Sequence, residues 1–334
     1  MAEKAKVRCG NVIERKERQM PEPRAWHIFT GNGRDSNALS RLPVAPPWRK
    51  VGGRAKAPAS TTYQVPTAAL DAINAALYLR RPLLVTGAPG VGKTTLADKI
   101  AYELRIESTF SWRITSRTTL GDGLYSYDAI SRLRDEHLNR SNQNPNATEI
   151  GKYLRLQGLG SAIASIGHSL LLIDELDKCD IDLPGDLLHV LEENAFSISE
   201  LERIADYQSS VSISDANGVP VIVTKGRVTG DGMPFIIMAS NEEREFPPAF
   251  LRRCVRLKLD PPSFEELLQI ARQYVDLKDG EVSAVARAFI ELQKTKSLST
   301  DQFLHVLYMI SSAGEGQLDR KAIKDILLHD LSTG

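Results

Sequence analysis

The chain has 334 residues, of which 42% are hydrophobic and 25% are charged, and its formal net charge is zero. This composition is typical of a soluble globular protein with room for about two domains. No apolar run reaches the roughly 20 residues of a membrane span, and the charged N-terminus lacks the apolar core of a signal peptide. We therefore expect a cytoplasmic protein without a membrane partner. Its three cysteines are far apart and its six histidines show no ligand spacing, so neither a disulfide framework nor a zinc site is indicated.

The first segment, residues 1–58, is basic and rich in proline. It contains 13 Lys or Arg residues against 5 Asp or Glu residues, and little helical or strand periodicity. We expect an extended N-terminal arm, either a solvated tail or a nucleic-acid-binding arm. A third interpretation is that Trp26, Phe29 and Trp48 anchor the arm on the acidic remainder of the chain or on a neighbouring subunit.

A helix is expected from Thr67, followed by a nucleotide-binding motif in the stretch LLVTGAPGVGKTTLADKIA, residues 83–101. The order is an apolar strand, a glycine-rich turn and an amphipathic helix, so backbone amides of the turn and of the helix start point at phosphate. Lys93 supplies a charge for the outer phosphates, and the Thr94 hydroxyl is placed to ligate Mg²⁺. The alternative is a glycine turn before an ordinary helix, but the complete GxxxxGK[ST] pattern favours a nucleoside triphosphate. The residues expected to contact the nucleotide are Gly87, Ala88, Pro89, Gly90, Val91, Gly92, Lys93, Thr94 and Thr95.

Two further apolar strands end in polar residues. SLLLIDELDK ends its apolar run at Asp174 and Glu175, and PFIIMASNEE ends at Ser240 and Asn241. The carboxyl ends of parallel strands face one crevice, so we expect these side chains to share a site with the glycine-rich loop. Asp174 would hold Mg²⁺ through its water shell, Glu175 would polarise the water that attacks the γ-phosphate, and Asn241 would orient that water or contact the phosphate. The alternative is that the carboxylates merely start a helix and that the asparagine is an ordinary turn residue.

An arginine pair follows in EREFPPAFLRRCVRLKL, where Pro247 and Pro248 stop the chain before a short helix. Arg252 and Arg253 lie at the end of that helix and are expected to point away from their own phosphate loop. A guanidinium supplied to the site of a neighbouring subunit would neutralise transition-state charge and make hydrolysis depend on assembly. The alternative is a solvated pair that caps the C-terminus of the helix.

The remaining segments predict an insertion, a hairpin and a helical lid. Residues 115–160 exceed what a crossover needs, and alternating apolar residues around Gly218 and Gly230 predict a β-hairpin. After Pro261 and Pro262, four helical segments follow, with start signals at Ser263, Ser299 or Asp319. We therefore predict an α/β fold with a parallel sheet, a β-hairpin insertion and a small C-terminal α-helical lid.

The motifs RPLLVTGAPGVGKTTLA, GLYSYDAISRLRD, LLLIDELDKCDIDLPGDLL and IIMASNEEREFPPAFLRRC together resemble an AAA+ P-loop ATPase of the MoxR-like branch, over about residues 63–262. The resemblance implies that 87–94 is Walker A, that Asp174 and Glu175 are Walker B, and that Asn241 is sensor 1. It implies that Arg253, with Arg252 beside it, is the arginine finger. No arginine matches sensor 2, and Lys296 is a candidate substitute.

The same resemblance implies ATP and Mg²⁺ as cofactors, a hexameric ring, and a chaperone-like remodeller of a protein client. That client would be a von Willebrand factor A domain protein, in some members within antiviral gene clusters. It also implies an insertion at the ring axis with Leu124, Tyr125 and Tyr127 as contacts, for which core packing is the alternative. The expected domains are 1–58, the arm; 59–260, the AAA+ domain; and 261–334, the lid. Two rival functions are a nucleic-acid motor of a restriction system, with salt-sensitive DNA stimulation, and a nucleotide-dependent assembly scaffold.

Overall fold

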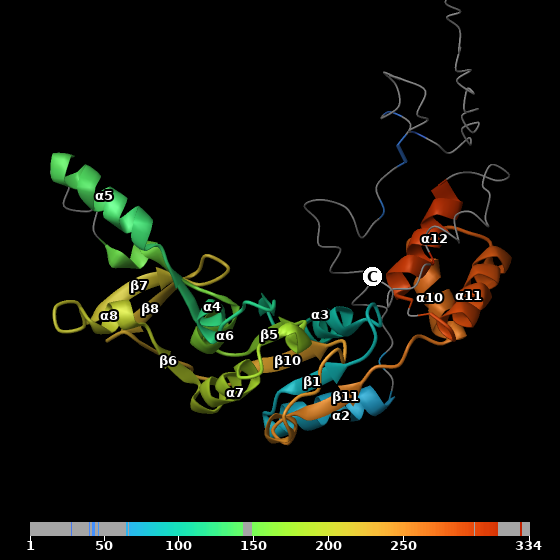
Figure 1. The fold of residues 1–334 in the computed structure, drawn as a ribbon, viewed down its shortest axis with the longest axis horizontal. Helices are drawn as coiled ribbons and strands as arrows, with labels where there is room; N and C mark the ends of the chain where they lie inside the picture. The colour runs from blue at the N-terminus through green and yellow to red at the C-terminus, as the bar shows by residue number, and fades with distance from the viewer. Residues whose placement is uncertain are drawn as a thin grey trace, which may run out of the picture.

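The computed structural model of the chain describes residues 67–142, 149–296 and 298–312, with single residues at 28, 40, 42, 43, 46, 65 and 328 (Figure 1). The predicted basic arm and the predicted helix at 319–331 lie almost wholly outside the described residues. None of the helices within the described residues has both the length and the apolar character that a membrane span requires.

A five-stranded parallel sheet forms the centre of the fold, as predicted. Its strands lie in the order β11-β1-β10-β5-β2. All four neighbouring pairs are parallel, so the carboxyl ends of the strands meet at one edge. Their bounds are β1 Leu83–Thr86, β2 Ser108–Arg113, β5 Ser169–Asp174, β10 Phe235–Ser240 and β11 Val255–Lys258.

Helices cover both faces of this sheet because its strands are apolar on both faces. Leu83 and Val85 of β1 pack in one hydrophobic cluster, with α2 and α3, whereas the intervening Leu84 packs in the other cluster, with α6 and α7. Successive side chains of a strand alternate between faces, so a continuous apolar run is buried twice. The helices are α2 Thr67–Leu79, α3 Lys93–Glu103, α6 Gly158–Ala164, α7 Leu183–Glu193 and the short α9 Pro248–Leu251.

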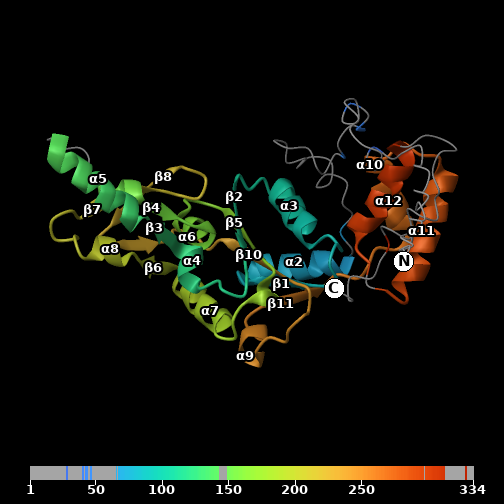
Figure 2. The ribbon, with the colours of Figure 1, turned by 45° about the horizontal axis from the view of Figure 1, so that its top comes forward.

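A second sheet of six strands, in the order β3-β4-β7-β8-β9-β6, lies beside the parallel sheet together with α5 (Figures 1 and 2). The predicted hairpin around Gly218 is confirmed as β7 and β8, but the next turn lies at 225–226 and not at Gly230. The strands are β3 Tyr125–Tyr127, β4 Leu154–Leu156, β6 Ala195–Ser197, β7 Ser210–Ser214, β8 Pro220–Thr224 and β9 Arg227–Thr229. The associated helices are α4 Leu120–Leu124, α5 Ala129–Asn142, α8 Ser199–Glu202 and the 3₁₀ turn η4 Ile150–Tyr153. The 3₁₀ turn η5 Leu176–Lys178 lies against β10 of the parallel sheet.

The tract 115–160 therefore builds part of this second sheet. Leu124 is buried in the hydrophobic core, which favours the core-packing interpretation over the predicted axial contact. Tyr125 and Tyr127 are partly buried and pack against the same core. The Tyr125 hydroxyl donates to Glu200 at 2.9 Å.

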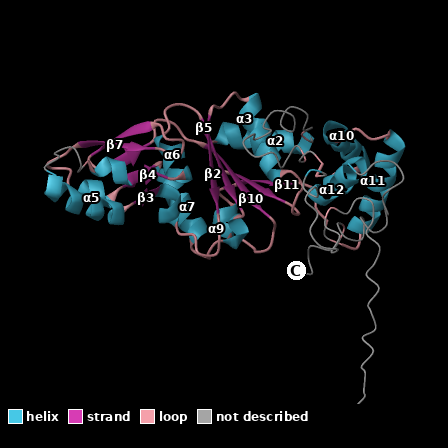
Figure 3. Cartoon of the chain, turned by 90° about the horizontal axis from the view of Figure 1, so that it is seen from above, coloured by secondary structure: helices cyan, strands magenta, loops and turns pink. Residues whose placement is uncertain are grey.

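Three C-terminal helices form a separate hydrophobic cluster on the other side of the parallel sheet, as seen from above in Figure 3. They are α10 Phe264–Tyr274, α11 Asp279–Gln293 and α12 Thr300–Ser312. Two predicted start signals are confirmed: Ser263 forms a capping box with Glu266, and the Ser299 hydroxyl accepts the amide of Gln302. In the centre of the cluster, the rings of Phe289 and Phe303 lie 5.3 Å apart.

Candidate active site

The glycine-rich loop joins β1 to α3 at the carboxyl edge of the parallel sheet. Gly87 and Gly90 have φ values of 149° and 77°. A Cβ atom at Gly87 would lie 2.5 Å from the Leu259 carbonyl oxygen, and one at Gly90 would lie 2.6 Å from Ser299 Cβ. Both the backbone conformation and the close neighbours therefore require glycine. The loop passes between the end of β11 and the start of α12.

Lys93 is the first residue of α3 and is only 8% exposed. Its Nζ atom donates to the carbonyl oxygens of Gly87, at 2.7 Å, and Ala88, at 3.1 Å, and to Asn241 Oδ1, at 2.7 Å. Burial lowers the pKa of Lys93, and the charge of Asp174 is the largest opposing effect. Lys93, on α3, and Asn241, after β10, were both predicted as site residues. They are 148 positions apart in the sequence, and the structure brings them into contact.

The two predicted Walker B carboxylates follow each other at the end of β5. Asp174 is partly buried, and its Oδ1 atom accepts the amide of Glu175 at 3.0 Å. Thr94, the second residue of α3, is exposed. The Thr94 hydroxyl follows the glycine-rich loop, and the Asp174 carboxylate lies at the end of β5. Such hard oxygen donors suit Mg²⁺, which prefers one or two carboxylates and substrate phosphates.

The Glu175 carboxylate is held by two cations. Arg113 donates to both of its oxygens, at 3.0 and 2.9 Å, and Lys178 Nζ lies 3.0 Å from Oε1. The hydrogen bonds from Arg113 are the main cause that lowers the pKa of Glu175 to about 2. In this arrangement the carboxylate is fully engaged and is a weak base.

Sequence reasoning did not identify Arg113, Lys178 or Asp177. Arg113 is the last residue of β2 and is paired in register with Asp174. Its position as a polar residue at the end of a strand is the sequence signal that could have identified it. Asp177 is 4% exposed, and its Oδ2 atom accepts the amides of Asn241 and Glu243. A cleft of 720 Å³ lies beside Glu175, and the residues that line it, polar except for Ile114, are Arg113, Ile114, Thr115, Ser116, Glu175, Asp177, Lys178, Glu243 and Arg244.

The predicted arginine pair lies elsewhere in the chain. Arg252 and Arg253 follow α9, which lies on the opposite side of the molecule from α3 (Figure 2). Arg253 Nε is 2.8 Å from Glu192 Oε1 of α7, and both side chains are about half exposed. The structure therefore does not bring the pair to the phosphate loop of its own chain.

The sensor 2 candidate, Lys296, forms a hydrogen bond within the C-terminal segment. Its Nζ atom donates to the carbonyl oxygen of Leu328 at 3.3 Å, which links two parts of the C-terminal segment. The residues that approach the phosphate loop from this segment are Ser299 and Thr300.

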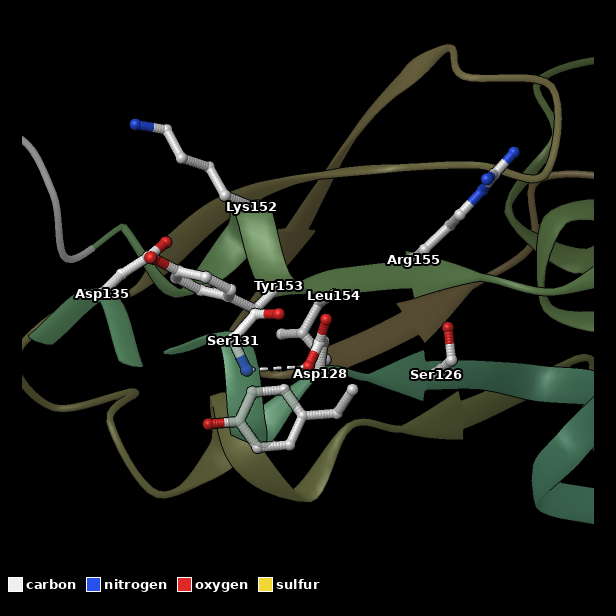
Figure 4. A pocket seen from close by; sticks show the side chains of 9 residues that line it. Ser126, Asp128, Ser131, Asp135, Lys152, Tyr153, Leu154 and Arg155 are labelled. Atoms are coloured by element: carbon white, nitrogen blue, oxygen red, sulfur yellow. Dashed lines mark hydrogen bonds between the residues drawn. The ribbon is translucent and has the colours of Figure 1, made fainter. Parts of the chain in front are cut away.

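A second cavity, of 640 Å³, lies against β3, β4 and α5 (Figure 4). Among its lining residues, Tyr127 is the one that the sequence analysis named, as an axial contact. The Tyr153 hydroxyl donates to Asp135 at 2.8 Å, and Asp128 accepts the amide of Ser131 at 2.9 Å, so much of its polar lining is engaged internally. We assign no role to this cavity.

Comparison with known proteins agrees with the geometry around Lys93. Residues 82–254, slightly more than half of the chain, match the family of AAA domains in its dynein-related subfamily. A search of curated protein sequences gave no match. Among solved structures, a RuvB mutant from Thermotoga maritima is similar, with 16% sequence identity and a TM-score of 0.41, over 79% of this chain and 69% of that chain.

Proposed function

The chain belongs to the family of AAA domains, in its dynein-related subfamily, and from this premise we propose that it hydrolyses ATP at a site completed by a neighbouring copy. The observation that carries the proposal is the 2.7 Å hydrogen bond between Lys93 and Asn241. It unites the helix after the glycine-rich loop with the end of β10, beside the carboxylates of β5. Each of these elements contributes a polar group to one crevice.

In this proposal Lys93 exchanges partners when ATP binds. Its ammonium group has three donors, and in the structure two of them satisfy carbonyl oxygens of its own loop. Phosphate oxygens replace these carbonyl oxygens, because a charge-assisted bond to phosphate is the stronger one. Asn241 then faces the outer phosphate together with Lys93.

Thr94 and Asp174 are the residues that would hold Mg²⁺. When bound, the ion would neutralise charge on the phosphates. The role of Glu175 is to take the proton of the attacking water, which requires that its carboxylate leaves Arg113 and Lys178.

Arg253 acts in trans in this proposal, with Arg252 beside it. Its side chain is 53% exposed while its Nε atom pairs with Glu192, so the guanidinium is accessible from outside the chain. A neighbouring copy that places its phosphate loop against α9 would receive a guanidinium near the γ-phosphate. Several copies arranged in this way close into a ring, for which we propose a hexamer.

The work of the ring, in our proposal, is the remodelling of a protein client, as the resemblance to MoxR-like ATPases implies. A client with a von Willebrand factor A domain and a role in antiviral defence belong to the same hypothesis. The rival, a nucleic-acid motor, is favoured by the basic composition of residues 1–58. ATP turnover that is stimulated by DNA and falls steeply with salt would select this rival.

The test of the proposal combines two inactive variants. Glu175→Gln removes the base, and Arg253→Ala removes the guanidinium supplied to the neighbour, so each variant alone should turn over ATP at a small fraction of the wild-type rate. After random mixing, about a quarter of the interfaces combine an intact Glu175 with an intact Arg253, and the mixture should regain activity in that proportion. Glu193→Gln, on the exposed face of α7, is the matched control and should leave turnover unchanged. Full activity of Arg253→Ala alone would refute catalysis in trans.

A further inference from the structure

Asp177 is a buried carboxylate that neither the sequence motifs nor the proposed mechanism uses. It lies in η5, three residues after Asp174, and is 4% exposed. Its Oδ2 atom accepts two backbone amides from the segment after β10: that of Asn241 at 3.0 Å and that of Glu243 at 3.1 Å. A single carboxylate oxygen, in the turn that follows β5, therefore binds the backbone segment that carries Asn241.

The backbone of that segment is shaped for this contact. Glu242, between the two bound amides, has a φ of 63°, a left-handed conformation that is unfavourable for a residue with a side chain. Alternation of right- and left-handed residues directs neighbouring amides to one concave side, where they bind an anion. Here the anion is the Asp177 carboxylate, and Ser240 Oγ accepts the remaining amide, that of Glu242, at 3.0 Å.

The second carboxylate oxygen of Asp177, Oδ1, takes no part in these hydrogen bonds. Oδ1 is buried and has no hydrogen-bond partner among the described residues. A buried acceptor without a donor destabilises a fold, and an asparagine would bind the two amides through one carbonyl oxygen without a charge.

We propose that Asp177 is a positioning residue for hydrolysis: it holds the backbone of Asn241 so that the amide side chain stays in front of Lys93. This inference rests on the proposed function. Asp177 does not touch the nucleotide. It links the ends of β5 and β10, so the carboxylates of one strand and the asparagine of the other keep a fixed separation while Lys93 exchanges its partners.

The kinetic test compares Asp177→Ala with Asp177→Asn in the full chain. The alanine variant loses the clamp, and we expect kcat to fall by about 10- to 100-fold while the KM for ATP changes less than about threefold, because misplacement acts mainly on the transition state. The asparagine variant keeps an oxygen for the two amides and should recover most of that loss. Asp180→Asn, an exposed carboxylate on the same segment, is the control and should match the wild type. An asparagine variant as slow as the alanine variant would overturn the clamp.

A second readout does not depend on turnover. Hydrogen exchange at the Asn241 and Glu243 amides should be slow in the wild type and in Asp177→Asn, and fast in Asp177→Ala. If the alanine variant does not fold, Asp177→Ser, which keeps a polar atom but cannot bridge both amides, takes its place with the same expectation. Unchanged protection of both amides in these variants would overturn the inference, whereas a wild-type chain without ATP turnover would overturn the proposed function.

Discussion

Replacement of Arg113 by alanine tests whether the observed arrangement withholds Glu175 from catalysis. Arg113 makes two hydrogen bonds to this carboxylate, and Lys178 makes one close contact. In Arg113→Ala only Lys178 remains. We expect faster basal turnover of ATP, because the carboxylate becomes free to reach a water molecule without first breaking a bidentate pair.

The size of the effect follows from the pKa of Glu175. The pKa lies at about 2, against an ordinary value of 4.5, and Arg113 is the main cause. The loss of Arg113 moves the pKa upward, and a return to the ordinary value of 4.5 would raise the proton affinity about 300-fold. Since Lys178 still holds part of the charge, we expect a rise in basal kcat of about tenfold. At pH 7 the carboxylate is ionised in both proteins, so this gain reflects basicity and freedom of movement.

The same pair predicts a pH dependence of stability. The pKa of Glu175 is depressed in the folded chain, so pairing stabilises the fold above about pH 4.5, and this contribution is lost as the pH falls towards 2. The difference in unfolding free energy between the wild type and Arg113→Ala should therefore be present at pH 6 and shrink between pH 4.5 and 2.

The assay measures ATP turnover by the assembled protein at pH 7.5 and, separately, the titration of Glu175 by NMR of its carboxyl carbon. Arg117→Ala is the control: Arg117 is exposed four residues further along, and the described residues offer it no ion pair. A slower Arg113→Ala enzyme would refute the reasoning and make Arg113 a residue that orients Glu175. A Glu175 pKa that stays near 2 without Arg113 would refute it as well.

Three further changes have definite expected outcomes. Lys93→Ala should weaken binding of a fluorescent ATP analogue by roughly 100-fold or more, because the charge for the phosphates is lost, whereas Lys99→Ala on the same helix should bind normally. Gly90→Ala should lower the unfolding free energy by about 1–2 kcal/mol, through its positive φ, and displace α12 at Ser299; a denaturant titration with unchanged midpoint would contradict this. Phe289→Ala should cost about 3–5 kcal/mol in the C-terminal cluster, measured by chemical unfolding, and a loss below 1 kcal/mol would argue against that packing.

The parallel sheet and the residues at its strand ends could be predicted because each follows from a local rule. Continuous apolar runs predict strands buried on both faces, and the glycine-rich loop fixes which helix follows β1. Asn241 was identified as the polar residue after β10, and its hydrogen bond to Lys93 makes the two neighbours in space. The catalytic roles of these residues, and the domain boundary at 260, stay predictions.

The second sheet and the partners of Glu175 could not be predicted in the same way. β3, β4, β6 and β9 have three residues each, too few for an alternating pattern to be recognised, and β4 pairs with β7 across more than 50 residues of chain. Arg113 and Asp177 act through contacts with other strands, which depend on register and on backbone conformation. A single sequence carries no direct signal of either.

The Gly87–Leu259 and Gly90–Ser299 contacts place the glycine-rich loop between two segments from the C-terminal third of the chain. The surroundings of the glycine-rich loop thus include residues near 259 and 299, which are far from the loop in the sequence. A polypeptide that stopped after β11 would lack these residues even if its sheet formed normally. A displacement of the three C-terminal helices would therefore move Ser299 relative to Gly90 and change the surroundings of the loop on that side.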